Sequence, residues 1–143
     1  MNVAAILKDK GEGVFTMRPE NTLLEVATEL ASRKIGSVVV TEMGGSIAGI
    51  ISERDVVRVL AERGPEQLSA PVEQAMTKSV VTCTLSDTID ELMAEMTARR
   101  FRHLPVVDDG QLIGIVSIGD VVKQRIAEAE MEAEAMRAYI ATG

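Results

Sequence analysis

Hydrophobic residues in the first part of the chain recur at every third or fourth position. This spacing predicts a short helix over residues 1–10 and a second helix that begins at Asn21 or Thr22 and ends near Lys34. Glu25 stands three residues after Thr22, as in a capping box. Residues 14–17 lie between glycines and Pro19, and a short extended segment is expected there.

The pattern then changes to continuous β-branched runs. The runs at 37–41 and 47–51 predict two paired strands, joined by a tight turn at 43–46. Ser52 follows the second strand, and helical spacing resumes up to about Glu62. The inward positions of this helix are expected to be Val56, Val57, Val59 and Leu60.

The same order of elements occurs a second time. The stretch GIISERDVV at 49–57 recurs as GIVSIGDVV at 114–122, and both copies read Gly-apolar-apolar-Ser-x-x-Asp-Val-Val. Upstream of this turn, Val72, Ala75 and Met76 match Val3, Ile6 and Leu7, and residues 80–82 match 14–16. Several landmarks in one order indicate an internal duplication. We therefore divide the chain into a first repeat at 1–64, a linker at 65–71, a second repeat at 72–127 and a helical tail at 128–143.

Each repeat is predicted to run strand–helix–strand–strand–helix, which defines a mixed α/β (α+β) fold. About 60 residues bury little surface alone. The two small sheets are therefore expected to pack together with pseudo-twofold symmetry, and a C-terminal helix follows.

The tail carries a heptad-like apolar stripe. Its members recur at intervals of four and three, and they are Val122, Ile126, Ala129, Ala133, Met136 and Ile140. Three interpretations remain open at this stage: a helix packed on its own domain, a helix that builds a dimer or docks a partner, and a frayed tail.

Composition narrows the classes of function. Hydrophobic residues make up 46% of the chain and aromatic residues only 2%, so an aliphatic core is expected. The net charge of −7 argues against nucleic acid as a partner. A single Cys and a single His cannot build a typical zinc site, and no apolar run approaches the roughly 18 residues that span a membrane. One cysteine and no signal-peptide pattern favour a reducing cytoplasm.

The repeated turn has two physical interpretations. Ser52 and Asp55, like Ser117 and Asp120, have the spacing of a capping box, and capping alone would account for both pairs. The same geometry also suits a nucleotide. A helix N-terminus attracts phosphate, and a carboxylate can accept hydrogen bonds from the paired hydroxyls of a ribose.

The ordered set of motifs resembles a pair of CBS domains, also called a Bateman module. The residues that carry the resemblance are Thr16, Pro19, Thr22 and Gly49-x-x-Ser52-x-x-Asp55, followed by Thr82, Thr88, Leu104-Pro105-Val106-Val107 and Gly114-x-x-Ser117-x-x-Asp120. The resemblance covers about residues 1–127. It implies a regulatory module that binds an adenosine-containing ligand (AMP, ADP, ATP, NAD(H) or S-adenosylmethionine) in clefts between the repeats, and a disc-like homodimer formed through the helices after Ser52 and Ser117.

Carried over position by position, the resemblance implies two related pockets. The first would combine Asp120 for ribose and Ser117 near phosphate with Ile115, Thr16, Ile35, Gly36 and Ser37 around the base. The second would combine Asp55 and Ser52 with Ile50, Thr82, Phe101 and Arg102. Arg102, His103 and Arg54 are candidates for phosphate contacts. His103 could instead be a strand residue with a backbone partner, and Arg54 a solvated helix residue.

The two copies differ where a phosphate contact is expected. Gly36-Ser37 in the first repeat replaces Arg102-His103 of the second, and only the first turn carries a positive charge of its own, at Arg54. Two sites would therefore differ in affinity. Cys83 has neighbours that do nothing to lower its pKa, so it is interpreted as a small core residue.

We therefore expect a regulatory adenine-nucleotide sensor that modulates an unknown partner protein. Catalysis is not expected, because the sole His has no nucleophile beside it in the sequence and no glycine-rich phosphate loop occurs. The alternative is a ligand-free interaction scaffold that uses its CBS surfaces and its C-terminal helix. A third interpretation, the regulatory part of a larger enzyme or transporter, is less favoured by the start at Met1 and the loss of pattern after about Tyr139.

Overall fold

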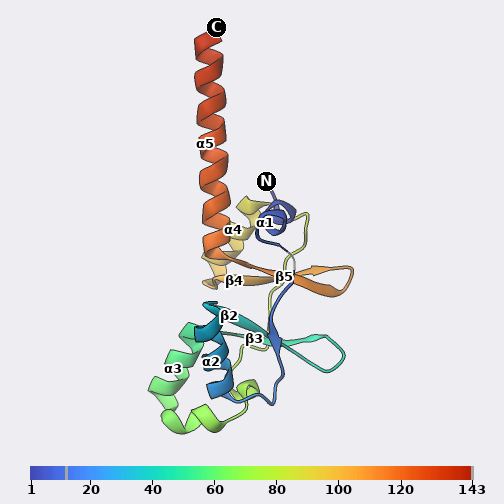
Figure 1. Ribbon diagram of the computed structural model, residues 1–143, viewed down its shortest axis with the longest axis vertical. Coiled ribbons are helices and arrows are strands. Elements are labelled where there is room, and N and C mark those ends of the chain that lie inside the picture. Colours follow the sequence, from blue (N-terminus) through green and yellow to red (C-terminus); the bar gives the residue numbers. More distant parts are fainter. Residues whose placement is uncertain (12, 143) are drawn as a thin grey trace. The chain divides into compact units, whose positions relative to one another are not determined.

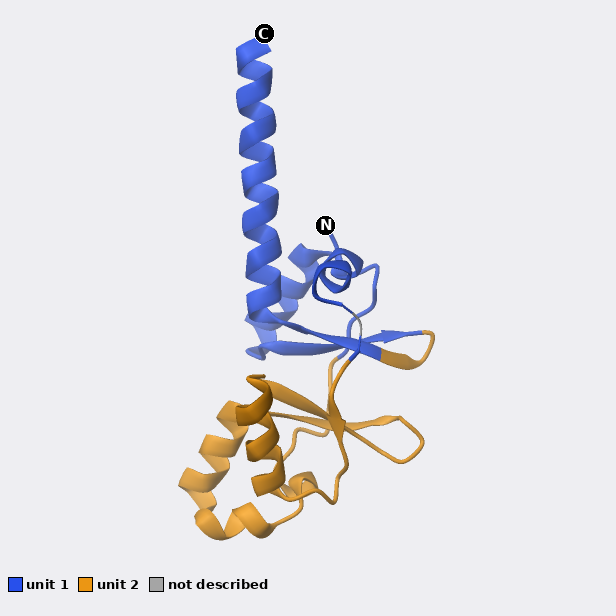
Figure 2. Cartoon of the chain, viewed as in Figure 1, with its two compact units in different colours: residues 1–13, 82–108, 113–143 blue, residues 14–81, 109–112 orange. Residues whose placement is uncertain are grey.

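A computed structural model describes residues 1–11 and 13–142, and they form two compact units. Unit 1 comprises residues 1–13, 82–108 and 113–143, and unit 2 comprises residues 14–81 and 109–112 (Figure 2). The units therefore differ from the contiguous repeats expected from the sequence, since the first residues of the chain group with the second repeat. The repeat boundaries themselves stay a prediction.

Unit 2 contains a three-stranded sheet in the order β1-β2-β3. β1 (Thr16–Met17) pairs in parallel with β2 (Ser37–Thr41), and β2 pairs antiparallel with β3 (Ile47–Ser52). Two helices complete this unit, α2 (Leu23–Arg33) and α3 (Glu53–Arg63), with the sheet beside them in Figure 1. Their buried side chains form one aliphatic core with the strands, in agreement with the pattern of the sequence.

The helix starts of unit 2 are those that the capping signals predict. Thr22 caps α2 and forms a capping box with Glu25, and Ser52 caps α3 in the same way with Asp55. Val57, however, was expected to face inward and is 67% exposed. Val56 and Val59 are three residues apart and share the buried face of α3, whereas Val57 lies roughly 100° around the helix from Val56.

The linker and the start of the second repeat form two 3₁₀ turns, η1 (Pro65–Ser69) and η2 (Val72–Gln74). The segment at 72–76 was matched to the N-terminal helix, and it shortens here to a single turn that still buries Val72. η1 lies against α2 and α3, and Val72 of η2 belongs to the core that the helices and strands of unit 2 form.

β4 (His103–Asp108) and β5 (Gln111–Ser117) form a two-stranded sheet, which belongs to unit 1 except for Gln111 and Leu112. Asp109 and Gly110 join them, and both have positive φ (50° and 75°), as a two-residue hairpin turn of the I′ type requires. The strand expected at 80–82 is wrong: this edge carries only an isolated parallel bridge between Cys83 and Val106. Cys83 occupies the place that Met17 has in the first repeat, where Met17 pairs with Val40.

Three helices complete unit 1: α1 (Val3–Lys10), α4 (Ile89–Arg99) and α5 (Ile118–Thr142). α1 buries Val3, Ile6 and Leu7, the three positions that the spacing predicts. α5 is continuous over 25 residues, so the last helix of the second repeat and the tail form one element. Its C-terminal half stands clear of α1, α4, β4 and β5, the other elements of its unit (Figure 1).

The structure selects among the interpretations of the tail. The heptad-like stripe from Val122 to Ile140 is exposed throughout, and Met136 and Ile140 are 60% and 70% exposed. A tail packed on its own domain is therefore wrong for residues 129–142. A frayed tail is also wrong, since the segment is helical up to Thr142.

Candidate functional site

The first repeated turn joins β3 to α3 and holds its Ser and Asp side chains together. Ser52 Oγ accepts a hydrogen bond from the Asp55 amide at 3.2 Å. Asp55 Oδ2 accepts bonds from the Ser52 amide at 2.9 Å and from Ser52 Oγ at 3.1 Å. The other carboxylate oxygen, Oδ1, accepts from Arg58 at 2.9 Å on the exposed side of the helix. Both oxygens of Asp55 therefore have donors from its own helix start.

The second repeated turn joins β5 to α5 and repeats the reciprocal cap. Asp120 Oδ2 accepts from the Ser117 amide at 2.9 Å, and Ser117 Oγ accepts from the Asp120 amide at 3.2 Å. Lys123 stands at the position equivalent to Arg58, but it does not supply the bond to the carboxylate. Instead Lys10 of α1 donates to Asp120 Oδ2 at 2.7 Å and to the Ile115 carbonyl at 2.9 Å. The two bonds that reach the Asp120 carboxylate, from the Ser117 amide and from Lys10, both end on Oδ2, so Oδ1 keeps its acceptor capacity.

The backbone donors at these two helix starts are largely paired inside the protein. The Glu53 amide donates to the Gly36 carbonyl at 3.0 Å, and the Ile118 amide donates to the Arg102 carbonyl at 2.8 Å. Together with the Ser and Asp amides, three of the four first-turn N–H groups have acceptors at each start. The fourth belongs to Arg54 in the first turn and to Gly119 in the second. An anion at either start would therefore meet one backbone donor rather than a full set.

The same carbonyl contacts bring the start of β2 to the first turn and the start of β4 to the second turn. In unit 2, Ser37 pairs with Ser52 in the sheet, beside Gly36, and the Ser37 side chain is buried. In unit 1, the exposed Arg102 and the half-buried His103 stand at the equivalent place, where β4 begins. The contrast between Gly-Ser and Arg-His is therefore located directly beside the turns, as the duplication predicts.

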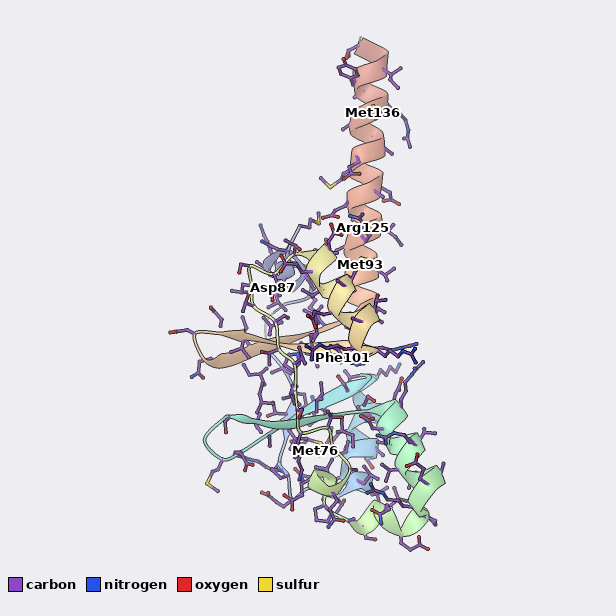
Figure 3. The ribbon with its side chains drawn as sticks, turned by 180° about the vertical axis from the view of Figure 1, so that it is seen from behind. Met76, Asp87, Met93, Phe101, Arg125 and Met136 are labelled. Atoms are coloured by element: carbon purple, nitrogen blue, oxygen red, sulfur yellow. The ribbon has the colours of Figure 1, made fainter. Side chains whose placement is uncertain are left out.

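The glycine that opens each copy of the motif has a packing role. A Cβ on Gly49 would lie 2.6 Å from Met76 Sδ and 2.7 Å from the Thr77 carbonyl oxygen. That close approach comes from the antiparallel bridge between Ile50 and Thr77, and Figure 3 shows Met76 beside β3. A Cβ on Gly114 would lie 2.9 Å from Leu7 Cδ2 of α1. Met76 and Leu7 are matched positions of the two repeats. The glycine of each repeat therefore packs against the opening segment of the other repeat.

The pKa values of Asp120 and Cys83 are shifted in opposite directions. Burial acts to raise the pKa of Asp120, but hydrogen bonds from Lys10 and Ser117 and the charge of Lys10 outweigh it, so the pKa lies below its ordinary value. Burial, with a smaller effect of Asp87, raises the pKa of Cys83 to about 12. Asp120 is therefore a fixed anion at neutral pH, and Cys83 is a buried thiol of the core, as expected.

The remaining predicted residues lie at the edges of these two arrangements. In unit 2, Thr16, Ile35 and Ile50 are half-buried and Arg54 is exposed. In unit 1, Ile115 and Phe101 are half-buried and Thr82 is exposed. Figure 3 shows Phe101 just before β4. The proposed division of these residues into two pockets, each drawn from both repeats, stays a prediction.

Lys10 and Arg58 were not predicted as partners of the two carboxylates. Arg58 stands three residues after Asp55, so helical spacing alone could have indicated it. Lys10 is 110 positions from Asp120, and no local pattern indicates that contact. The second turn carries no positive charge of its own, but the structure supplies one from α1.

Neither a metal-binding cluster nor a membrane-spanning helix occurs within residues 1–11 and 13–142. In that part of the chain no three His, Cys, Asp or Glu side chains gather in a way that could hold a metal ion. None of its helices combines the length and the apolar character needed to cross a lipid bilayer.

The fold and the duplicated turn define a tandem α/β module in which one repeated motif builds two related Ser–Asp turns. The chain belongs to the CBS domain family: the family model matches residues 10–62 and again residues 72–126. The repeat structure and the C-terminal helix expected from the sequence are thus confirmed.

Three known proteins illustrate the relationship. The crystal structure of the CBS-domain containing protein ATU1752 from Agrobacterium tumefaciens is 47% identical, covers 87% of this chain and 99% of its own, and superimposes with a TM-score of 0.86. The mitochondrial CBS domain-containing protein CBSX3 of Arabidopsis thaliana is 32% identical over 99% of this chain and 72% of its own length. A crystal structure of CBSX2 holds AMP; it is 22% identical, covers 90% of this chain and 98% of its own, and has a TM-score of 0.73. At that identity the likeness to CBSX2 concerns the fold alone.

Proposed function

We propose that this chain is a regulatory module that binds an adenosine-containing ligand through its repeated Ser–Asp turns. The observation that carries the proposal is the fixed carboxylate of Asp120, which is held by Ser117 and Lys10 through Oδ2 while Oδ1 keeps its acceptor capacity. Such a carboxylate suits the vicinal hydroxyls of a ribose, which are hydrogen-bond donors. A CBS protein of the same fold binds AMP, which contains this ribose.

The two turns are proposed to differ in strength. A ribose at the first turn would compete with Arg58 for Asp55 Oδ1, because that oxygen already accepts a bond. This ion pair is largely exposed and is worth only a few tenths of a kcal/mol up to about 1 kcal/mol, so displacing it costs little. Near the second turn Lys10 and Arg102 offer positive charge to a phosphate, and near the first turn Arg54 does so. We expect two binding events of unequal affinity.

Calorimetric titration tests the proposal with AMP, adenosine, ATP, NADH and S-adenosylmethionine. Asp55→Asn and Asp120→Asn keep an oxygen acceptor for the cap but remove the charge and one of the two acceptors. Each is expected to weaken binding at its own turn at least tenfold. The control Asp90→Asn changes a carboxylate that is 75% exposed on α4, and it should leave binding unchanged. Comparison of AMP with adenosine measures the contribution of the phosphate.

One result of the titration would refute the proposal of nucleotide binding. If no adenosine compound produces heat or raises the unfolding midpoint at millimolar concentration, the turns are helix caps only. The chain would then be the ligand-free scaffold considered as the alternative. The exposed apolar stripe of α5 is the observation that favours that second function, and its role does not depend on a ligand.

A further inference from the structure

α5 presents an apolar seam along most of its length that nothing in the described part of its own unit covers. The seam consists of Val122, Ile126, Ala129, Ala133, Met136 and Ile140, all exposed. Figure 3 shows Met136 on the part of α5 that lies far from Arg125 and from Met93 of α4. The opposite side of the helix start is occupied, because Asp120, Gln124 and Glu128 bond with Lys10, Asp9 and the amino group of Met1 in turn. α5 therefore has one face for its own unit and another that lacks a partner within the described residues.

We propose that this seam pairs with the same seam of a second copy, as a parallel, in-register two-stranded coiled coil. Its six members alternate by four and three, which is the a/d repeat of such a coil. Ile126, Ala133 and Ile140 take the a positions, and Val122, Ala129 and Met136 take the d positions. The two central layers are alanines, so the helix backbones can approach closely there.

The charges beside the seam select the parallel orientation. Arg125 and Glu132 take g positions, and Glu130 and Arg137 take e positions. In a parallel pair, each g residue faces the e residue five positions later on the second copy. Arg125 then faces Glu130 of the second copy, and Glu132 faces Arg137 of the second copy. Both contacts join opposite charges, and the twofold axis repeats each of them. Glu130, Glu132 and Arg137 form no ion pair within residues 1–11 and 13–142, so these charges are available. Arg125 already pairs with Asp90 and Glu128, and it would exchange or share one of these contacts with Glu130 of the second copy.

The antiparallel arrangement that keeps all six layers joins like charges instead. It sets Val122 against Ile140 and Ile126 against Met136, which brings e residues to e residues and g residues to g residues. Lys123 would then face Arg137, Glu130 would face Glu130, and Glu132 would face Glu132. The same sequence is thus favourable in one orientation and repulsive in the other, a form of discrimination that charged flanks provide in paired helices.

Cysteine crosslinking of the full chain tests both the contact and its register. Ala133→Cys places a thiol at an a position of the seam. Ala138→Cys places one five residues later, on the side of the helix away from the seam. Both positions are exposed alanines, so neither change disturbs a core. Under mild oxidation we expect a covalent dimer from A133C and none from A138C, because only facing residues of a parallel, in-register pair meet the distance of a disulfide. The natural Cys83 is 3% exposed and stays out of the reaction.

Charge exchange tests the flanking pairs. Glu132→Arg should raise the dissociation constant measured by sedimentation at least tenfold, because it sets two arginines against each other. Adding Arg137→Glu restores opposite charges in the reversed sense and should recover the original association. The proposal is overturned if the chain remains monomeric at millimolar concentration, if A138C crosslinks as well as A133C, or if the double exchange associates no better than E132R. Dimers that persist without a crosslink at A133C would show another interface and would equally overturn it.

Discussion

Lys10 Nζ lies 2.7 Å from Asp120 Oδ2, so the N-terminal helix supplies the counter-ion of the second repeated turn. The first turn obtains its counter-ion, Arg58, from its own helix. The two copies of the motif therefore share their Gly, Ser and Asp but differ in how each carboxylate is held. This difference has measurable consequences for stability and for acid sensitivity.

Asp120→Asn is expected to destabilise the chain at pH 7 and to cost progressively less in acid. The pKa of Asp120 is lowered below its ordinary value of 3.8 in the folded chain, so the carboxylate stabilises the fold above that value. This contribution is lost as the pH falls through the still lower pKa of the folded state. Urea unfolding of the natural chain and the variant from pH 7 down to about pH 3 measures the difference. A difference that stays constant over this range would contradict the role of the charge.

A double-mutant cycle measures the Lys10–Asp120 contact itself. We expect Lys10→Ala and Asp120→Asn together to cost less than the sum of the single changes, with a coupling of about 0.5–1 kcal/mol, since the pair is partly exposed. Arg58→Ala serves as the control, because it is the counter-ion of the other turn. It should show no coupling to Asp120→Asn.

Gly49→Ala is expected to destabilise the chain by about 1–3 kcal/mol. Its new Cβ would meet the backbone oxygen of Thr77 as well as the Met76 side chain. Gly114→Ala should cost less, because its Cβ meets only the end of the flexible Leu7 side chain. Gly44→Ala is the matched control, since its Cβ would lie in open space and its backbone is unstrained. Denaturant unfolding gives all three values, and an equal cost at Gly44 would refute the packing argument.

Cys83 is expected to resist thiol reagents in the folded chain. Its pKa of about 12 and its burial leave almost no exposed thiolate at pH 8. Reaction with a disulfide reagent should be complete within seconds in denaturant and should follow the rate of unfolding in its absence. Rapid modification of the native chain would show that this edge of unit 1 opens readily.

Removal of residues 132–142 should leave the stability of a dilute sample unchanged. These residues are exposed, and within residues 1–11 and 13–142 no ion pair joins them to the other elements of unit 1. Glu128, which bonds the amino group of Met1, is retained. Thermal unfolding at several protein concentrations checks this. If the truncation lowers the midpoint equally at every concentration, the tail packs within one copy.

Local patterns predict most elements of this fold. The caps Thr22–Glu25 and Ser52–Asp55 depend on residues three apart, and the buried face of α1 depends on spacing within eight residues, so both could be derived from the sequence. The strand expected at 80–82 failed, because a strand exists only where a neighbour pairs with it, and here one bridge at Cys83 does so.

The site is less accessible to sequence reasoning, since its distinguishing contacts are long-range. The motif identifies Ser117 and Asp120, but the packing of α1 brings Lys10 to them. From its position in the sequence, Lys10 cannot be distinguished from a solvent-exposed lysine at the end of a helix. The repeated glycine was the one available signal of close approach, because only Gly49 and Gly114 leave room for Met76 and Leu7.

The placement of α1 also sets an order of events during synthesis. α1 is synthesised well before its partners, since its amides bond the carbonyls of Leu85 and Asp87, and Lys10 must wait for a residue 110 positions later. Closing so long a segment has an entropic cost that grows with its length, so these contacts form late. Residues 14–81 can complete their own sheet and helices beforehand. The nascent chain therefore acquires the second Ser–Asp turn in its final form only after Asp120 has been made and can reach Lys10.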